Sequence, residues 1–129
     1  MVKTKLNISL IIPAYNEEMS IKETLEKIDL TLFDEKINYE IIVVDDGSTD
    51  NTKQIIKQFK KVVLLEHANN QGYGASLKDG IKIAKHPWIL ITDADGTYPI
   101  AEIPNLCKFV PDYDMVVGAR IKKGAKIPS

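Results

Sequence analysis

Short apolar runs alternate with longer amphipathic segments along the whole chain. Four runs suit strands that are buried on both faces, and they cover residues 8–12, 41–44, 62–65 and 88–92, with a shorter fifth run at 115–117. Between the runs, apolar residues recur three or four positions apart, which is the spacing of a helix with one buried face. This alternation predicts an α/β fold in which helices cover both faces of a mostly parallel, doubly wound sheet.

The helices between the runs have recognisable starts and inner faces. Ser20 to Glu23 has the pattern of a capping box, and it opens a helix whose apolar positions are Ile21, Leu25, Ile28 and Leu32. The inner faces are assigned to Ile55, Ile56 and Phe59 in the second helix and to Leu77, Ile81 and Ala84 in the third. A fourth helix is predicted over residues 100–109.

Composition narrows the class of protein. The chain has 129 residues and a formal net charge of −1, which suits one domain and argues against the basic field that nucleic-acid binding needs. Cys107 is the single cysteine, so no intrachain disulfide forms, and we expect a buried, inert thiol in a cytoplasmic, reducing compartment. No stretch approaches the roughly 20 apolar residues of a membrane span, so we expect membrane contact only indirectly or through a further segment.

The pattern stops soon after the fifth run, at Ile127-Pro128-Ser129. We therefore expect residues 1–129 to form a single domain that is truncated at its C-terminal end. The sheet edge after Val117 would then be exposed, and a partner such as a second copy of the chain would cover it.

Two of the predicted strands end in pairs of acids. Asp93-Ala94-Asp95 follows the run at 88–92, and Asp45-Asp46 follows the run at 41–44. The carboxyl ends of parallel strands meet at one sheet edge, where ligands bind in open α/β folds. Carboxylate oxygens suit a Mg²⁺ or Mn²⁺ ion that also holds substrate phosphates.

Two other loops add binding chemistry at the same edge. Residues 13–17 place the aromatic ring of Tyr15 where it can stack on a base, and the carboxylate of Glu17 where it can accept ribose hydroxyls. Residues 72–76 are mostly small and allow close backbone approach at a helix start, although Gly72 and Gly74 are better explained as turn and packing glycines. Base, ribose and metal-held diphosphate together describe a site for a nucleotide-sugar donor.

The order of these motifs resembles that of the family 2 glycosyltransferases, which have the GT-A fold, a Rossmann-like nucleotide-binding half. Within that family the chain is most similar to the polyprenyl-phosphate sugar transferases, the group that includes dolichyl-phosphate mannosyltransferase. The supporting segments are residues 93–99, Ile103-Pro104 and Gly118-Ala119-Arg120. The resemblance covers essentially the whole chain.

The resemblance implies a role for each matching residue. The donor-binding residues would be Pro13, Tyr15 and Glu17 around the nucleoside, Val44 and Asp46 at the base, Asp93 and Ala94 near the ribose and diphosphate, and Arg120 at the phosphates. Asp93 and Asp95 would be the catalytic pair and the metal ligands, with Asp95 the principal one. Thr97 stands where the family often has a Gln near the metal, which is a departure from the pattern.

The resemblance also implies the reaction. It is a single displacement with inversion, from a donor of the GDP-mannose or UDP-glucose type to a polyprenyl (dolichyl) phosphate or a glycan, at the cytoplasmic face of a membrane. A polyprenyl phosphate already carries an anionic oxygen and needs no general base. A sugar hydroxyl would need a catalytic Asp from a later segment.

Three other interpretations of the sequence compete with this one. A nucleotide-sugar-binding fragment or pseudoenzyme would form the donor pocket without transfer. A receiver-type signalling domain would need an acidic pair after the first strand and an Asp after the third, where this chain has Pro13-Ala14-Tyr15 and Glu66-His67. A dinucleotide oxidoreductase would need a Gly-x-Gly-x-x-Gly turn after the first strand.

Three further polar residues are not assigned to the site. Asp45 is assigned a structural role, and His67 and His86, which lack the spacing of metal ligands, are assigned to surface or strand-end positions.

Overall fold

Four parallel strands form the centre of the computed structural model, which describes residues 6–33, 37–95 and 100–104. The strands are β1 (Leu6–Ala14), β2 (Ile37–Asp45), β3 (Val63–Glu66) and β4 (Trp88–Ile91), in the order β3-β2-β1-β4. Each strand overlaps one of the first four predicted runs, and β1 and β2 are longer than predicted. The predicted fifth strand, the fourth helix beyond residue 104, Thr97, Cys107 and Arg120 lie outside the described residues.

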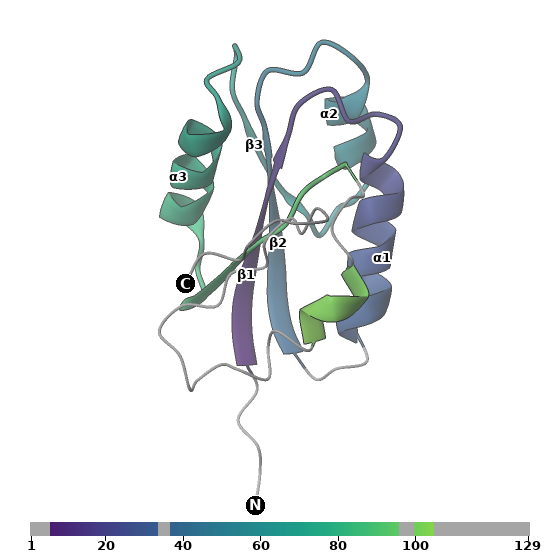
Figure 1. Ribbon diagram of the computed structural model, residues 1–129, viewed down its shortest axis with the longest axis vertical. Helices are drawn as coiled ribbons and strands as arrows, with labels where there is room; N and C mark the ends of the chain where they lie inside the picture. Colours follow the sequence, from purple (N-terminus) through teal and green to yellow (C-terminus); the bar gives the residue numbers. More distant parts are fainter. Residues whose placement is uncertain (1–5, 34–36, 96–99, 105–129) are drawn as a thin grey trace, which may run out of the picture.

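Helices cover both faces of the sheet, which confirms the predicted doubly wound α/β architecture. Figure 1 shows α1 (Ile21–Phe33), α2 (Thr52–Ile56) and the 3₁₀ helix η1 (Ile100–Glu102) on one face, and α3 (Tyr73–Ile83) on the other. Strands sandwiched in this way must be apolar on both sides, which is why their sequences are nearly continuous hydrophobic runs.

The larger part of the core lies between the sheet and α1. The apolar face of α1 is fully buried at the four predicted positions, Ile21, Leu25, Ile28 and Leu32. These side chains pack with alternate residues of β1, including Leu10 and Ile12. Each such side chain contributes about 1.5–3 kcal/mol through removal from water, so this interface holds α1 against the sheet.

The α3 face is smaller and more closely packed. Ile11, Ile42 and Val44 form its buried centre, with Leu77 and Ala84 against them as predicted. The prediction for Ile81 is wrong, because its side chain is 44% exposed. Gly80 takes the inner position instead, and a Cβ there would lie 2.7 Å from Cγ2 of Ile11 and 3.2 Å from Cγ2 of Val44. The missing side chain lets α3 approach the sheet.

The chain reverses direction across the sheet between β1 and β4. From β1 it passes through α1 to β2 and through α2 to β3, and α3 then carries it over the opposite face to β4, on the far side of β1. Such a switch leaves a crevice at the carboxyl ends of the two strands that flank it. The loops after β1 and β4 are therefore brought together.

Candidate active site

A cleft of about 400 Å³ lies at this switch point. It is lined by residues from the loops that follow the strands: Pro13, Ala14, Tyr15, Glu17, Asp46, Asn70, Gly72, Tyr73, Ser76, Asp93, Ala94 and Asp95. Seven residues that the sequence assigned to the site are among them. Asn70 had no assignment, and Tyr73 and Ser76 were predicted only as part of the loop at residues 72–76, because their polar groups carry no distinctive spacing.

The segment after β4 is fixed by its middle residue. The carbonyl oxygen of Ala94 accepts hydrogen bonds from the hydroxyls of Ser20, at 2.8 Å, and Thr24, at 3.3 Å. Ala94 is buried, and Asp93 and Asp95 on either side of it line the cleft. Helix α1 therefore anchors the Asp-x-Asp segment to the core.

This anchoring replaces the predicted capping box. The Ser20 hydroxyl lies against Ala94 and the Glu17 carboxylate, while the Glu23 carboxylate pairs with Lys27 at 2.8 Å. The prediction of a reciprocal Ser20–Glu23 cap is wrong because both side chains have other partners. The sequence pattern located the start of α1 correctly but misassigned what its first serine binds.

Asn16 holds the loop after β1 in place. Its φ of 52° is in the left-handed region, which Asn tolerates better than most residues. Its side-chain oxygen accepts a hydrogen bond from the backbone N–H of Thr49 at 2.8 Å, and the N–H of Glu17 donates to the Thr52 hydroxyl at 2.8 Å. The loop after β1 is thus joined to the loop after β2, and Tyr15, which is 45% exposed, stands at the rim of the cleft.

The cleft is acidic, because the side chains of Glu17, Asp46, Asp93 and Asp95 all line it. Burial raises the pKa of Glu17, and the negative charges of Asp95, Asp50 and Asp93 raise it further, against the lowering effect of the Ser20 hydroxyl. A cation in the cleft would reduce this repulsion.

Asp93 and Asp95, the two residues predicted to bind such a cation, both line the cleft. Across residues 6–33, 37–95 and 100–104, no group of three or more His, Cys, Asp or Glu side chains is arranged to hold a metal. Mg²⁺ is commonly bound by one or two carboxylates together with water and substrate phosphates, so a carboxylate pair fits an ion that arrives with a diphosphate.

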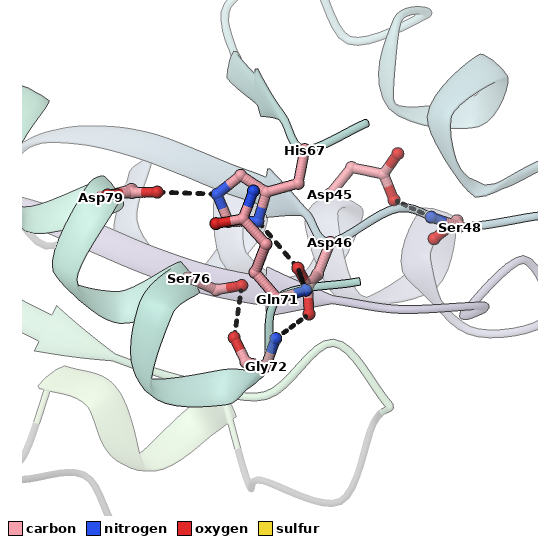
Figure 2. Close-up of polar contacts among 8 residues, drawn as sticks. All are labelled: Asp45, Asp46, Ser48, His67, Gln71, Gly72, Ser76 and Asp79. Atoms are coloured by element: carbon pink, nitrogen blue, oxygen red, sulfur yellow. Dashed lines mark hydrogen bonds and ion pairs between the residues drawn. The ribbon is translucent and has the colours of Figure 1, made fainter. Parts of the chain in front are cut away.

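Asp46, which also lines the cleft, takes part in three hydrogen bonds through its carboxylate. Its Oδ1 accepts from the backbone N–H of Gln71 at 2.8 Å and contacts Nδ1 of His67 at 2.7 Å, and its Oδ2 accepts from the N–H of Gly72 at 2.9 Å (Figure 2). Burial alone would raise the pKa of Asp46, but these hydrogen bonds outweigh it and hold the pKa below its usual range. Asp46 is ionised and organises the turn into α3.

His67 was predicted to be an unremarkable surface or strand-end residue. It does follow β3, but it is buried, and its Nε2 contacts Oδ2 of Asp79 on α3 at 2.8 Å (Figure 2). Hydrogen bonding to Asp46 raises the pKa of His67, burial partly opposes this, and Asp79 raises it further. No spacing rule signals this contact, because the two partners lie 21 and 12 residues away along the chain.

The last two residues of β2, Val44 and Asp45, do not line the cleft. The side chain of Val44 is fully buried under α3 and does not line the cleft, so its predicted contact with a base finds no support in this geometry. Asp45 is also buried, and its Oδ1 accepts from the N–H of Ser48 at 3.3 Å, which matches the structural role expected of it. Arg120 lies outside the described residues.

In the part of the chain that the structure describes, no helix has both the length and the apolar character needed to cross a membrane.

Comparisons with known proteins agree with this geometry. The model of a family described as Glycosyl transferase family 2 matches residues 9–128. A dolichol-phosphate mannosyltransferase from Pyrococcus furiosus is 32% identical over 126 residues, which cover 95% of this chain and 35% of the relative. This chain spans about half the length, or less, of the first curated relatives that it matches.

Solved structures give the same family. A mannosyltransferase from Pyrobaculum calidifontis, in complex with GDP-Man and Mn²⁺, matches with a TM-score of 0.73 at 27% identity, over 84% of this chain and 33% of that one. Residues 1–349 of S. aureus TarS, in complex with UDP-GlcNAc, match with a TM-score of 0.63 at 31% identity, over 70% of this chain and 27% of that one. The chain belongs to glycosyltransferase family 2 and has the fold of the GT-A glycosyltransferases.

Proposed function

We propose that this chain is the donor-binding part of a metal-dependent, inverting glycosyltransferase that moves a sugar from a nucleotide sugar to a polyprenyl phosphate. The observation that carries the proposal is the placement of Asp93 and Asp95 at the switch point, on either side of the anchored Ala94. They share one cleft with the aromatic ring of Tyr15 and the carboxylate of Asp46.

Each wall of the cleft suits one part of the donor. Pro13 and Tyr15 supply the apolar surface on which a base stacks, Glu17 faces the ribose hydroxyls, and Asp46 accepts a hydrogen bond from the base. Asp93 and Asp95 would hold the ion, and the resemblance to the family assigns Arg120, outside the described residues, to the phosphates. When bound, Mg²⁺ or Mn²⁺ would act as a Lewis acid that neutralises charge on the departing nucleotide.

The acceptor proposal rests on the relatives. The Pyrococcus furiosus relative is named a dolichol-phosphate mannosyltransferase, which supports a lipid-linked acceptor and therefore a reaction at a membrane surface. The phosphate oxygen of such an acceptor is already an anion, so no side chain has to remove a proton from it. Donors of the GDP-mannose and UDP-glucose types both carry the base, ribose and diphosphate that these residues would bind.

A second candidate function is donor binding without transfer. Both candidates require the donor site. A transfer assay with a polyprenyl phosphate separates them, since product formation by this chain would exclude the binding-only function.

The donor site is tested by calorimetric titration with nucleotide sugar, with and without Mn²⁺. We expect Asp95→Asn to weaken metal-dependent binding at least about tenfold, because a lost charged ligand costs more than the roughly 1.4 kcal/mol of a tenfold change. Glu26→Gln, which removes an exposed carboxylate on α1, is the control and should bind like the parent chain. Equal binding by a folded Asp95→Asn variant would refute the assignment.

A further inference from the structure

The hydrogen bonds of Asp46 leave little acceptor capacity for a ligand. An ionised carboxylate offers about four lone-pair positions, two on each oxygen. The Nδ1–H of His67 and the N–H of Gln71 occupy both positions on Oδ1, and the N–H of Gly72 occupies one on Oδ2. One position, on Oδ2, remains.

Further hydrogen bonds fix the positions of Asp46 and His67. The backbone N–H of Asp46 donates to the carbonyl of Ala14 at 2.8 Å, which continues the β1–β2 ladder beyond the strands. The backbone N–H of His67 donates to the carbonyl of Asp45 at 2.9 Å, and its ring is held from the far side by Asp79. Rotating the Asp46 carboxylate would therefore break several hydrogen bonds in a site that is only 4% exposed.

The two candidate bases make different demands on a carboxylate. Guanine presents two adjacent donors, N1–H and N2–H, which pair best with both oxygens at once. Uracil presents a single donor, N3–H, between two carbonyl groups, and needs one oxygen only. A carboxylate with one remaining acceptor position matches uracil but can meet only one of the two guanine donors, so the second donor would give up its hydrogen bond to water without a replacement from Asp46.

Extending the proposed function, on which this step rests, we propose that the donor carries a uracil base and that His67 is the positioning residue that excludes guanine. His67 acts through Asp46: together with Gln71 it fills Oδ1, so that only Oδ2 can meet the base. The substrate class is thus a uridine-diphosphate sugar.

The test is calorimetric titration of this chain with UDP and with GDP, each at saturating Mn²⁺. We expect UDP to bind at least about tenfold more tightly than GDP, in line with the discrimination that an unpaired polar group provides. GDP binding as tightly as UDP would overturn the inference, and this comparison does not depend on whether any variant folds.

Variants at position 67 test the cause of the selectivity. His67→Ala opens an acceptor position on Oδ1, so the ratio of GDP to UDP dissociation constants should fall at least about fivefold. His67→Asn should restore the ratio, because its amide nitrogen can occupy the place of Nδ1. A purely structural role would weaken both nucleotides equally and leave the ratio unchanged, which would overturn the role assigned to His67.

The outcomes also separate this inference from the proposed function. Tight GDP binding that needs Mn²⁺ and is lost in Asp95→Asn would refute the choice of base and leave the donor site intact. Binding of neither nucleotide by a chain with native circular dichroism would refute the proposed function, and the inference with it.

Discussion

At the scale of single residues, His67 links the chemistry of the site to the stability of the fold. Its ring lies between two carboxylates, with Nδ1 on Asp46 and Nε2 on Asp79. Two donors are available only to an imidazolium, and a buried cation is tolerated only when it is paired. Both carboxylates favour the charged ring, which is why the pKa of His67 is raised above its ordinary value of 6.5.

This linkage predicts how stability depends on pH. In the unfolded chain His67 titrates near its ordinary pKa, so its contribution is complete below about pH 6.5 and is lost as the pH rises through the higher folded value. The free-energy advantage of the parent chain over His67→Gln should therefore narrow from about pH 6 toward about pH 9 in urea titrations. His86→Gln, at the other histidine, is the control. An advantage that is constant over this range would contradict the charged pairing.

At the scale of elements, α3 is the part of the fold whose position affects the site most. Its first turn carries Tyr73 and Ser76 into the cleft, and the Ser76 hydroxyl donates back to the Gly72 carbonyl at 3.0 Å (Figure 2). Its middle is held close to β1 and β2 by Gly80. Displacement of α3 would therefore move one wall of the site as well as part of the core.

The close approach of α3 is tested by adding one methyl group. Gly80→Ala places a carbon within 2.7 Å of Cγ2 of Ile11, a stiff, buried, β-branched side chain. Overpacking costs about 1–3 kcal/mol, which exceeds the gain in helix propensity of up to about 1 kcal/mol, so the variant should be less stable by about 1–2 kcal/mol. Gly74→Ala, in the same helix with nothing within 4 Å of the new carbon, should not be destabilised. Equal stability of the two variants in urea would rule out this packing.

The arrangement of elements was predictable from the sequence, whereas several side-chain environments were not. Apolar runs and helical spacing located all four described strands and the buried face of α1, because burial selects those patterns directly. Periodicity could not identify the inner face of α3, since Gly80 carries no hydrophobic signal and the adjacent Ile81 does.

In the candidate site, too, the positions of the loops were predictable from the sequence, whereas some side-chain environments were not. The acids after β2 and β4 and the loop after β1 were predicted because strand ends converge at one edge, and Asp46, Asp93 and Asp95 do line one cleft. The burial of Val44 and the ion pairs of His67 were not predicted, for a common reason. Whether a residue beside a strand end faces the core, the cleft or a buried ion pair depends on contacts with segments distant in the chain.

At the scale of the whole molecule, the topology brings distant segments into one site. β1 and β4 are paired neighbours, with Ile11 beside Ile91, because α3 carries the chain back across the sheet (Figure 1). The loop at residues 13–17 therefore lies next to Asp93-Ala94-Asp95, and both lie at the carboxyl end of the sheet. The amino ends of the strands, near Asn7 and Asn38, lie at the opposite end.

Paramagnetic broadening by Mn²⁺ in the NMR spectrum of the ¹⁵N-labelled chain, with UDP present, tests the central claim most directly. We expect nucleotide-dependent broadening that is strongest for the amides of residues 93–95, extends to the loop at residues 13–17, and leaves Asn7 and Asn38 sharp. Asp95→Asn should abolish it. Broadening centred elsewhere, or unchanged in that variant, would contradict a metal-held nucleotide in the cleft between β1 and β4.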